Sequence, residues 1–384
     1  MSDIKIMFVS LRIVLLLVFF ISGYFLSKSK TDKQYWKIAV FPIVAFAIIS
    51  GLRFGRDVDY NIYYHIYSGS IIRNEEFLFS LFVNSFNNLN LPYYSFVLFC
   101  STFFIICFLY LLCKFKNAAF YILPLFLIIG GIENYIRWYP AFGFVLIAVG
   151  KLIEKRYLTV ACLAIASYFM HEGMIIILFT IAMFYLFTNK KILFTPKISV
   201  LLLAVTLFLS SVEYLQSLVS ILDYFQFGFL SEKGLYYVEK AGKIASGGLR
   251  TGVYEKTGLS EIRWFICYAF PLYFGGKYFE ENKLEFPAWL YNLSAFSIII
   301  MPVFTLVELF NRISSALMCF SIIAVGVTIF VANKQRFTNK KTYFYLIVCF
   351  MLFLSSIIIT SFNRTEDNKM LFIWDAKGRN YIKY

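Results

Sequence analysis

The feature that most constrains the fold of this chain is a series of long apolar runs separated by short polar loops. A helix needs roughly 20 apolar residues to cross the hydrocarbon core of a bilayer, where its backbone polar groups must bond to one another. Because 60% of the residues are hydrophobic and only 15% are charged, a soluble fold is excluded. The sequence therefore predicts an all-α, polytopic integral membrane helical bundle of about 10–12 transmembrane helices with one long outer loop. The expected spans are residues 6–26, 38–52, 93–113, 118–132, 136–152, 157–171, 174–188, 198–212, 263–279, 288–308, 313–332 and 342–361.

Three further features bear on the class of protein. The first apolar run is long enough to span and has no small-residue cleavage site after it, so we expect a retained helix and not a signal peptide. All seven cysteines lie inside apolar runs without a Cys-x-x-Cys pair, which indicates packing residues. The net charge of +14 is divided among short loops, which indicates topology signals and anionic lipids or ligands, and no nucleic acid.

Basic residues recur in alternate loops, which the positive-inside rule places in the cytoplasm. The opposite face then carries the residues around Arg53, Arg137, His171 and Arg312. Alternation through the expected spans places the C-terminal tail, residues 362–384, outside although it is basic, so either one span is miscounted or the tail is an exception. The cytoplasmic loops carry Lys28, Lys30, Lys33, Lys37, Lys114, Lys116, Lys151, Lys155, Arg156, Lys190, Lys191, Lys197, Lys277, Lys283, Lys334, Arg336, Lys340 and Lys341.

Lysine dominates the predicted cytoplasmic loops, whereas arginine gathers on the outer face. The positive-inside rule treats the two residues alike, so it does not explain this difference. The planar guanidinium binds phosphate oxygens bidentately, which predicts a phosphate-bearing ligand at the outer leaflet. For any single arginine the alternative is a side chain that snorkels to the interface. The outer arginines are Arg53, Arg56, Arg73, Arg137, Arg250, Arg263 and Arg312.

The densest polar cluster follows the second predicted span and contains Gly51, Arg53, Gly55, Arg56, Asp57 and Asp59. The glycines allow a tight exit from the helix. Charges at a membrane edge are costly unless they are paired or functional, so the cluster is either a ligand site or an Arg53–Asp59 ion pair that locks the loop. Asp57 and Asp59 also form the Asp-x-Asp pattern that holds a divalent metal in many glycosyltransferases. Because the loop supplies few further oxygen ligands, we expect no metal and no other cofactor.

Other polar turns fall on the same predicted face. Arg137 and Arg312 each begin a helix there, where the helix dipole adds to the guanidinium in binding an anion. For Arg137 the alternative is an aromatic-belt anchor together with Trp138. His171 lies in a turn between two closely spaced helices and is either a general base or a polar hinge residue.

We expect one transmembrane domain over residues 1–384. Residues 53–92 form its first periplasmic loop, within which residues 77–90 are expected to form an interfacial or re-entrant helix. Residues 213–262 form the long periplasmic loop, either a lid over the substrate or a plain surface domain.

Several short motifs resemble one family. Gly51-Leu52-Arg53, followed by Asp59-Tyr60 and Tyr63-Tyr64, resembles the first outer loop of bacterial O-antigen and exopolysaccharide polymerases of the EpsG-like (Wzy) type, although Asp57 stands where that family usually has Gly. Ile136-Arg137-Trp138 and Phe169-Met170-His171 are similar to the family's Arg-Gln helix and its Phe-His-Ser turn, with Trp138 in place of Gln and Glu172 in place of a small residue. Asn311-Arg312-Ile313 resembles the late Arg-Ile segment.

The resemblance implies a multi-pass glycosyltransferase of the bacterial inner membrane whose active site is on the periplasmic face. It would transfer a growing glycan from undecaprenyl diphosphate onto the terminal sugar of a new lipid-linked repeat unit. The expected partners are these two lipid-linked oligosaccharides and membrane lipid, and a chain-length regulator protein is a further candidate. The residues expected to stabilise the diphosphate are Arg53, Arg56, Arg137 and Arg312, with Arg250 and Arg263 as further candidates. His171 is the expected base, and Asp59 acts as base or holds Arg53.

Three other classes of protein stay open. A flippase for the same lipid-linked sugars would also need cationic groups, but it would expose them to both sides, often across repeated halves that this sequence lacks. A membrane acyltransferase would pair His with Arg, and its acyl donor would arrive from the cytoplasm. A purely structural membrane protein leaves the outer arginines unexplained.

Overall fold

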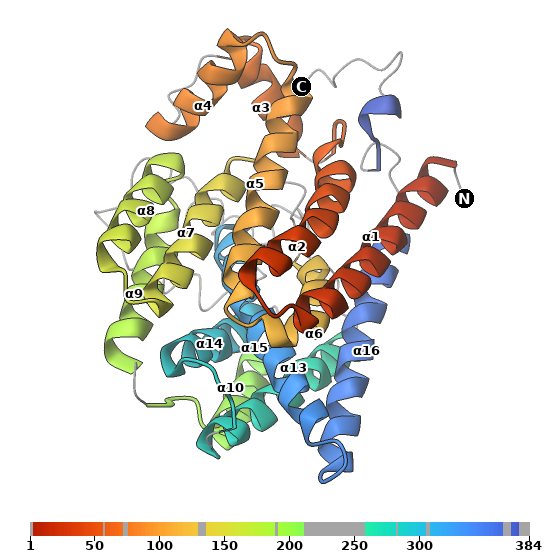
Figure 1. Cartoon of the computed structure of the whole chain (residues 1–384), viewed down its shortest axis with the longest axis vertical. Helices are drawn as coiled ribbons and strands as arrows, with labels where there is room; N and C mark the ends of the chain where they lie inside the picture. The colour runs from red at the N-terminus through yellow and green to blue at the C-terminus, as the bar shows by residue number, and fades with distance from the viewer. Residues whose placement is uncertain are drawn as a thin grey trace. The chain divides into compact units, whose positions relative to one another are not determined.

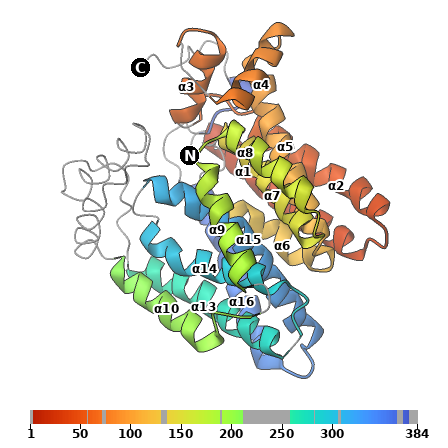
Figure 2. The same ribbon diagram turned by 90° about the vertical axis from the view of Figure 1, so that its left-hand side faces the viewer.

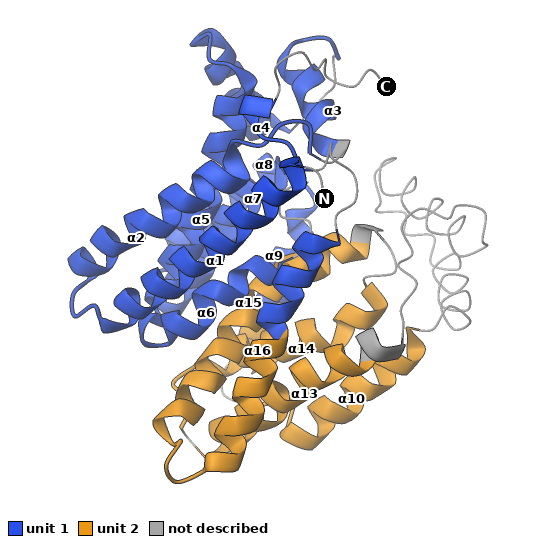
Figure 3. Ribbon diagram, turned by 90° about the vertical axis from the view of Figure 1, so that its right-hand side faces the viewer, with its two compact units in different colours: residues 1–182, 353–384 blue, residues 183–352 orange. Residues whose placement is uncertain are grey.

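The computed structural model describes residues 3–56, 58–71, 76–129, 136–188, 191–210, 258–281, 283–304, 308–363 and 370–375. The chain forms two compact units, coloured separately in Figure 3. Unit 1 comprises Met1–Ala182 and Phe353–Tyr384, and unit 2 comprises Met183–Leu352. Most of the predicted loop 213–262 lies outside the described residues.

The prediction of an all-α fold is confirmed, since the described residues form helices and no strand (Figures 1 and 2). Five of these helices are long and apolar enough to cross a membrane, which makes the chain a polytopic helical membrane protein. Three of them are α1 (Asp3–Lys28), α5 (Tyr93–Cys113) and α16 (Lys340–Phe362). The fourth is Phe310–Lys334, which lies within α15 (Glu308–Lys334). The fifth, Asp32–Gly51, consists of α2 (Asp32–Phe46) and the π-helical turn that follows it. Shorter apolar helices are α6 (Ala119–Leu125) with its flanking 3-10 turns, α7 (Trp138–Ile153), α8 (Tyr157–Met170), α9 (Met174–Thr188), α10 (Pro196–Leu209) and α14 (Ala288–Phe304).

The predicted spans agree closely with these helices. Residues 93–113 and 174–188 coincide with α5 and α9. The prediction is less accurate for residues 118–132, where α6 ends at Leu125 and a 3-10 turn, Phe126–Ile128, follows. Pro124 lies in the last turn of α6.

Unit 1 is held together by small residues and aromatic rings. A Cβ on Gly23 of α1 would lie 2.7 Å from the Ala119 carbonyl oxygen, so only glycine allows α1 to approach α6 this closely. Between α5 and α7, the rings of Phe104 and Tyr139 stack with centroids 4.7 Å apart. The Ser167 hydroxyl of α8 donates to the Ala141 carbonyl of α7 over 2.8 Å.

The two glycines of the polar cluster have different structural roles. Gly51 ends the π-helical turn Ala47–Gly51, and a Cβ there would lie 2.9 Å from Leu98 Cδ1 and 3.1 Å from Leu98 Cα. It therefore allows this segment to pack directly against α5. Gly55 has a φ of +59°, in the left-handed region that glycine adopts without strain, so it makes the turn that the sequence predicted.

Two short helices follow this turn at one end of unit 1. They are α3 (Val58–Tyr67) and α4 (Phe77–Asn88), which Figures 1 and 2 show near the end where α1 and α5 begin. The helix expected over residues 77–90 is thus confirmed as a helix of 12 residues. The Asn87 amide donates to the Tyr67 carbonyl over 2.9 Å and joins α4 to the end of α3.

The loops predicted to be cytoplasmic gather at the other end of unit 1. Lys116 forms an ion pair with Asp32 over 3.5 Å, and Lys114 pairs with Glu154, which also accepts from Lys151 over 3.0 Å. Lys114 follows the last residue of α5, whereas Gly51 packs against Leu98 near its beginning. At 1.5 Å per residue, these two positions are about 24 Å apart along α5. The lysine loops and the Arg53 cluster therefore lie toward opposite ends of unit 1, as predicted.

Unit 2 contains α10, α13 (Gly258–Glu280), α14 and α15. Serine hydroxyls connect α14 to α15: Ser294 donates to the Phe320 carbonyl and Ser321 donates to the Ser294 carbonyl, each over 3.0 Å. Small polar residues of this kind allow membrane helices to pack closely.

Candidate functional site

Arg53 lies in a short extended segment that pairs with the C-terminal tail. The Phe54 amide donates to the Leu371 carbonyl and the Ile373 amide donates to the Leu52 carbonyl, each over 3.1 Å. These bonds place Arg53 opposite Phe372 in an isolated β-bridge. Residues 370–375 of the tail therefore lie on the same side of unit 1 as the Arg53 loop. This agrees with the placement by helix alternation and overrules the one suggested by the basic charge of the tail.

The guanidinium of Arg53 is fully buried and only partly satisfied. Its side chain has 0% exposure, and Nη1 donates to the Ser50 carbonyl over 2.8 Å. Its Nε and Nη2 have no hydrogen-bond partner, and within the described residues no carboxylate forms an ion pair with it. The Arg53–Asp59 ion pair that we considered is therefore not formed. The ring of Tyr139, 5.9 Å from Arg53 Cζ, supplies only a weak cation–π contact. A buried cation in this state is costly unless an anion joins it.

Arg56, also fully buried, is occupied by the chain itself. Its Nε donates to the Leu371 carbonyl over 2.7 Å and its Nη2 to the Met370 carbonyl over 3.4 Å. The rings of Phe8 and Phe372 lie 5.0 and 4.1 Å from its Cζ. Arg56 thus fastens the C-terminal segment to the cluster, so its expected role as a diphosphate ligand is a weaker hypothesis than that of Arg53.

Arg137 caps the start of α7 and forms an ion pair with Glu76, which precedes α4. The two side chains are 14% and 7% exposed. The Cζ of Arg137 also lies 5.8 Å from the ring of Tyr63 and 5.7 Å from that of Phe79. The other Glu76 oxygen accepts from the Glu172 amide over 3.4 Å. One carboxylate therefore joins the beginning of α4, the beginning of α7 and the turn after α8.

Sequence reasoning did not identify Glu76. The available signal was an acidic residue directly before an apolar helix, inside a loop otherwise expected to contact an anion. Its partner is 61 residues away in the sequence, so the pairing depends on the tertiary fold.

His171 lies in the turn after α8, and its ring accepts a hydrogen bond. The Gly173 amide donates to Nδ1 over 3.0 Å. This bond fits the alternative of a polar hinge residue in the turn. The expected role of His171 as the base stays a prediction. Asp59, in the first turn of α3 and partly buried, is the carboxylate of the cluster that the structure describes.

The remaining predicted residues lie on other segments of the chain. Arg312 and Arg263 are partly buried and belong to unit 2, on α15 and α13. Asp57, Arg73 and Arg250 lie outside the described residues. Among the residues that the structure describes, no three His, Cys, Asp or Glu side chains form a group suited to a metal ion. The expectation of a metal-free site stays a prediction, because Asp57 is not described.

Comparison with known proteins identifies one family. The model of the EpsG family matches residues 36–371, which is most of the chain and includes Arg53, Glu76, Arg137, His171 and Arg312. Neither characterised proteins nor solved structures give a significant match.

Proposed function

This chain belongs to the EpsG family, and on that basis we propose that it polymerises O-antigen or a related surface polysaccharide. In the proposed reaction the bond between the anomeric carbon of the growing glycan and undecaprenyl diphosphate breaks. A hydroxyl of the terminal sugar on a new lipid-linked repeat unit attacks that carbon and loses its proton to a base. The products are a glycan longer by one repeat unit and free undecaprenyl diphosphate, formed at the periplasmic face of the bacterial inner membrane.

The observation that carries this proposal is the buried guanidinium of Arg53. Within the described part of the chain, two of its nitrogens have no hydrogen-bond partner, its exposure is 0%, and the ring of Tyr139 lies 5.9 Å from its Cζ. In such a low-dielectric site a preorganised cation stabilises the charge that develops on a leaving diphosphate far more than it would in water. The ligand charge offsets the cost of burying Arg53, which nothing else in the described part of the chain does.

The other residues have supporting roles in this proposal. Arg137 presents a second guanidinium, held in place by Glu76, and Arg312 is a further candidate ligand residue. Asp59 is the proposed base, since its carboxylate can accept the proton of the acceptor hydroxyl. His171 is the other candidate for the base. Arg56, Arg250 and Arg263 are further candidate ligand residues.

Deletion of the gene followed by gel analysis of the surface polysaccharide tests the reaction class. A polymerase is required for long chains, so the deletion should leave the lipid core with a single repeat unit in place of a ladder. Loss of every repeat unit would indicate a flippase, and an unchanged ladder with altered acylation would indicate an acyltransferase. Either result would refute the proposal.

The same assay tests the site. Arg53→Ala and Arg137→Ala should each abolish the ladder while the protein still inserts in the membrane at wild-type amounts. Lys116→Ala, at the opposite end of unit 1, is the matched control and should leave the ladder unchanged. A normal ladder in either arginine variant would remove that residue from the mechanism.

A further inference from the structure

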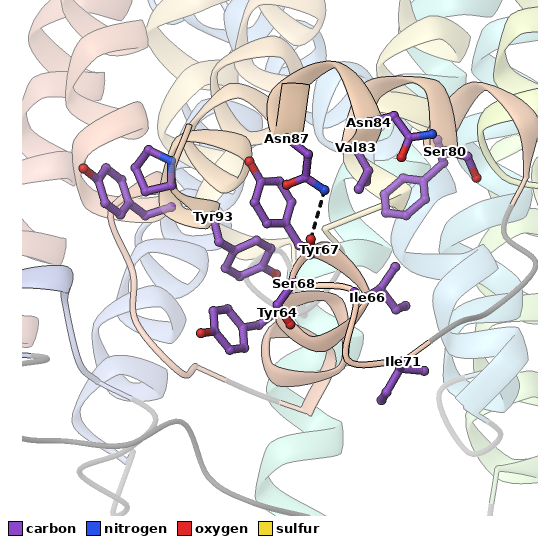
Figure 4. Close-up of a pocket in the computed structure, with 14 residues that line it drawn as sticks. Tyr64, Ile66, Tyr67, Ser68, Ile71, Ser80, Val83, Asn84, Asn87 and Tyr93 are labelled. Atoms are coloured by element: carbon purple, nitrogen blue, oxygen red, sulfur yellow. Dashed lines mark hydrogen bonds between the residues drawn. The ribbon is translucent and has the colours of Figure 1, made fainter. Parts of the chain in front are cut away.

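An open pocket of about 940 Å³ lies within unit 1, between α3, α4 and the first residues of α5 (Figure 4). Its volume falls within the roughly 300–1,000 Å³ typical of ligand pockets. The function proposed above does not assign this pocket a role. Figure 4 shows side chains from the turn after α3 and from α4 around it, with Tyr67 and Asn87 joined by a hydrogen bond.

The lining combines aromatic rings with neutral hydrogen-bonding groups. Tyr64, Tyr67 and Tyr94 supply rings with phenol groups, and Asn84 and Asn87 supply amides. Among the residues that the structure describes, those that line the pocket carry no acidic or basic side chain. Burial raises the pKa of Tyr67, so that phenol also stays uncharged at neutral pH. The pocket is therefore suited to an uncharged ligand that is rich in hydroxyl groups.

Hydrogen bonds and ring contacts fix the aromatic wall before any ligand binds. The Tyr67 hydroxyl donates to the Leu91 carbonyl over 2.7 Å, and the Tyr93 hydroxyl donates to the Tyr60 carbonyl over 3.0 Å. The ring of Tyr93 lies 5.4 Å from that of Tyr67 and 5.6 Å from that of Tyr64. Because these rings are already ordered, little side-chain entropy is lost when a ligand stacks on them.

The amides provide the polar half of the site. The Nδ2 of Asn87 donates to the Tyr67 carbonyl, which turns the amide and leaves its Oδ1 as an acceptor. Asn84, one turn earlier on α4, is exposed and makes no hydrogen bond within the described part of the chain. A lipid acyl chain would leave these amides without partners, whereas sugar hydroxyls satisfy them.

The pocket adjoins the arginine site through Phe79. This ring lines the pocket and lies 5.7 Å from Arg137 Cζ. A ligand with a diphosphate at Arg137 can therefore extend its uncharged part toward the pocket. Both sites lie within unit 1, so this relation does not involve the position of unit 2.

We propose that this pocket is a subsite for uncharged sugar residues, in which Tyr64 and Tyr94 stack on pyranose rings and Asn84 and Asn87 bond to their hydroxyls. The proposal rests on the proposed function, since it assigns the pocket to the glycan of the lipid-linked substrate. It adds the part of the site that recognises sugar and separates it from the part that binds diphosphate.

Binding to the purified full-length protein in lipid nanodiscs tests the subsite. Three probes are titrated by calorimetry: a single repeat-unit oligosaccharide released from its lipid, a released fragment of several repeat units, and inorganic pyrophosphate. Asn84→Ala and Tyr94→Ala are compared with the controls Asn88→Ala, also exposed on α4 but not lining the pocket, and Tyr168→Ala. Tyr94 and Tyr168 are 41% and 40% exposed, so the two tyrosine variants remove similar surface.

Each pocket variant should weaken oligosaccharide binding about tenfold, the effect of losing roughly 1.4 kcal/mol, and leave pyrophosphate binding unchanged. Both controls should bind as the wild type does. Tighter binding of the single repeat would assign the subsite to the acceptor, and tighter binding of the longer fragment would assign it to the donor. The subsite is refuted if the wild type binds neither oligosaccharide, or if all four variants bind them equally well.

The outcome separates this inference from the proposed function. If the deletion strain keeps its ladder while the pocket variants lose oligosaccharide binding, the polymerase is refuted and the sugar site stands. If the ladder depends on the gene but oligosaccharide binding is unaffected by the pocket variants, only the subsite is refuted.

Discussion

Replacing Arg53 with methionine should stabilise the ligand-free protein or leave its stability unchanged, and should strongly weaken its affinity for diphosphate. Methionine keeps an unbranched side chain of similar length and removes the charge. The substitution loses one charged hydrogen bond, from Nη1 to the Ser50 carbonyl, worth about 1.5–3 kcal/mol. It also removes an unpaired buried cation, whose effective desolvation cost is several kcal/mol. The two effects oppose each other, so we expect no fall in the melting temperature.

Binding should change much more. The Nε and Nη2 of Arg53 can each donate to a phosphate oxygen, at about 1.5–3 kcal/mol per charged hydrogen bond. Together they contribute roughly 3–6 kcal/mol, so the affinity for pyrophosphate should fall by about 10²–10⁴-fold in Arg53→Met. Calorimetric titration in nanodiscs measures the affinity, and thermal unfolding followed by tryptophan fluorescence measures the stability.

Arg56→Met provides the contrast, because Arg56 donates to two backbone carbonyls and contacts two rings. Its loss should lower the melting temperature by several degrees through release of the C-terminal segment. The reasoning fails if Arg53→Met unfolds at a clearly lower temperature than the wild type while its pyrophosphate affinity is unchanged. Arg53 would then be a structural residue.

Three further predictions concern the surroundings of this site. Glu76→Gln should destabilise the protein and shorten the polysaccharide ladder, because it leaves the buried charge of Arg137 without the Glu76 carboxylate. Glu172→Gln changes an exposed residue and should have neither effect. Thermal unfolding measures the stability, and gels measure the ladder. Phe372→Ala should cost about 3–5 kcal/mol and speed hydrogen exchange of residues 370–375, and an exchange rate equal to that of the wild type would contradict the role of this ring. A hydrogen bond from Lys114 lowers the pKa of Glu154 to about 2 from its usual value near 4.5. The ionised Glu154 therefore stabilises the folded protein, by at most about 1 kcal/mol for a solvent-screened pair. This stabilisation is full above pH 4.5 and is lost as the pH falls toward 2. Glu154→Gln should therefore lower the melting temperature at pH 6 and approach the wild type at pH 2, and a constant difference over that range would rule out this linkage.

The helices of the fold could be predicted because each depends on its own sequence. A run such as 93–113 is apolar throughout, and in a bilayer a segment of that kind has no alternative to a helix. The prediction was less accurate over residues 118–132, where the α-helix gives way to a 3-10 turn at Phe126. The sequence also did not decide at which end of the helices the C-terminal tail lies, because its charge and the alternation of spans disagreed. The hydrogen bonds of Leu371 and Ile373 to the segment around Arg53 place it beside that segment.

The candidate site was predicted only in part. Arg53 and Arg137 stand out in sequence because charge is rare in so apolar a chain. Their partners do not, since Arg137 pairs with Glu76 across 61 residues and Arg56 bonds to Leu371 across 315. The Gly173 amide donates a hydrogen bond to the ring of His171, and no residue type or spacing indicates this bond.

The three arginines that the sequence presents as equivalent have different environments, and this difference favours a division of labour. Arg56 is saturated by carbonyls and rings, so it can hold the tail but has little capacity for a ligand. Arg137 shares its charge with Glu76, so an anion bound there must compete with a carboxylate. Arg53 alone retains two donors in a buried setting. In the proposed reaction, a ligand at Arg53 would meet a buried cation that no described carboxylate neutralises, whereas Arg137 would exchange Glu76 for the diphosphate. The return of Arg137 to Glu76 after glycan transfer would then weaken the binding of the leaving diphosphate and favour its release.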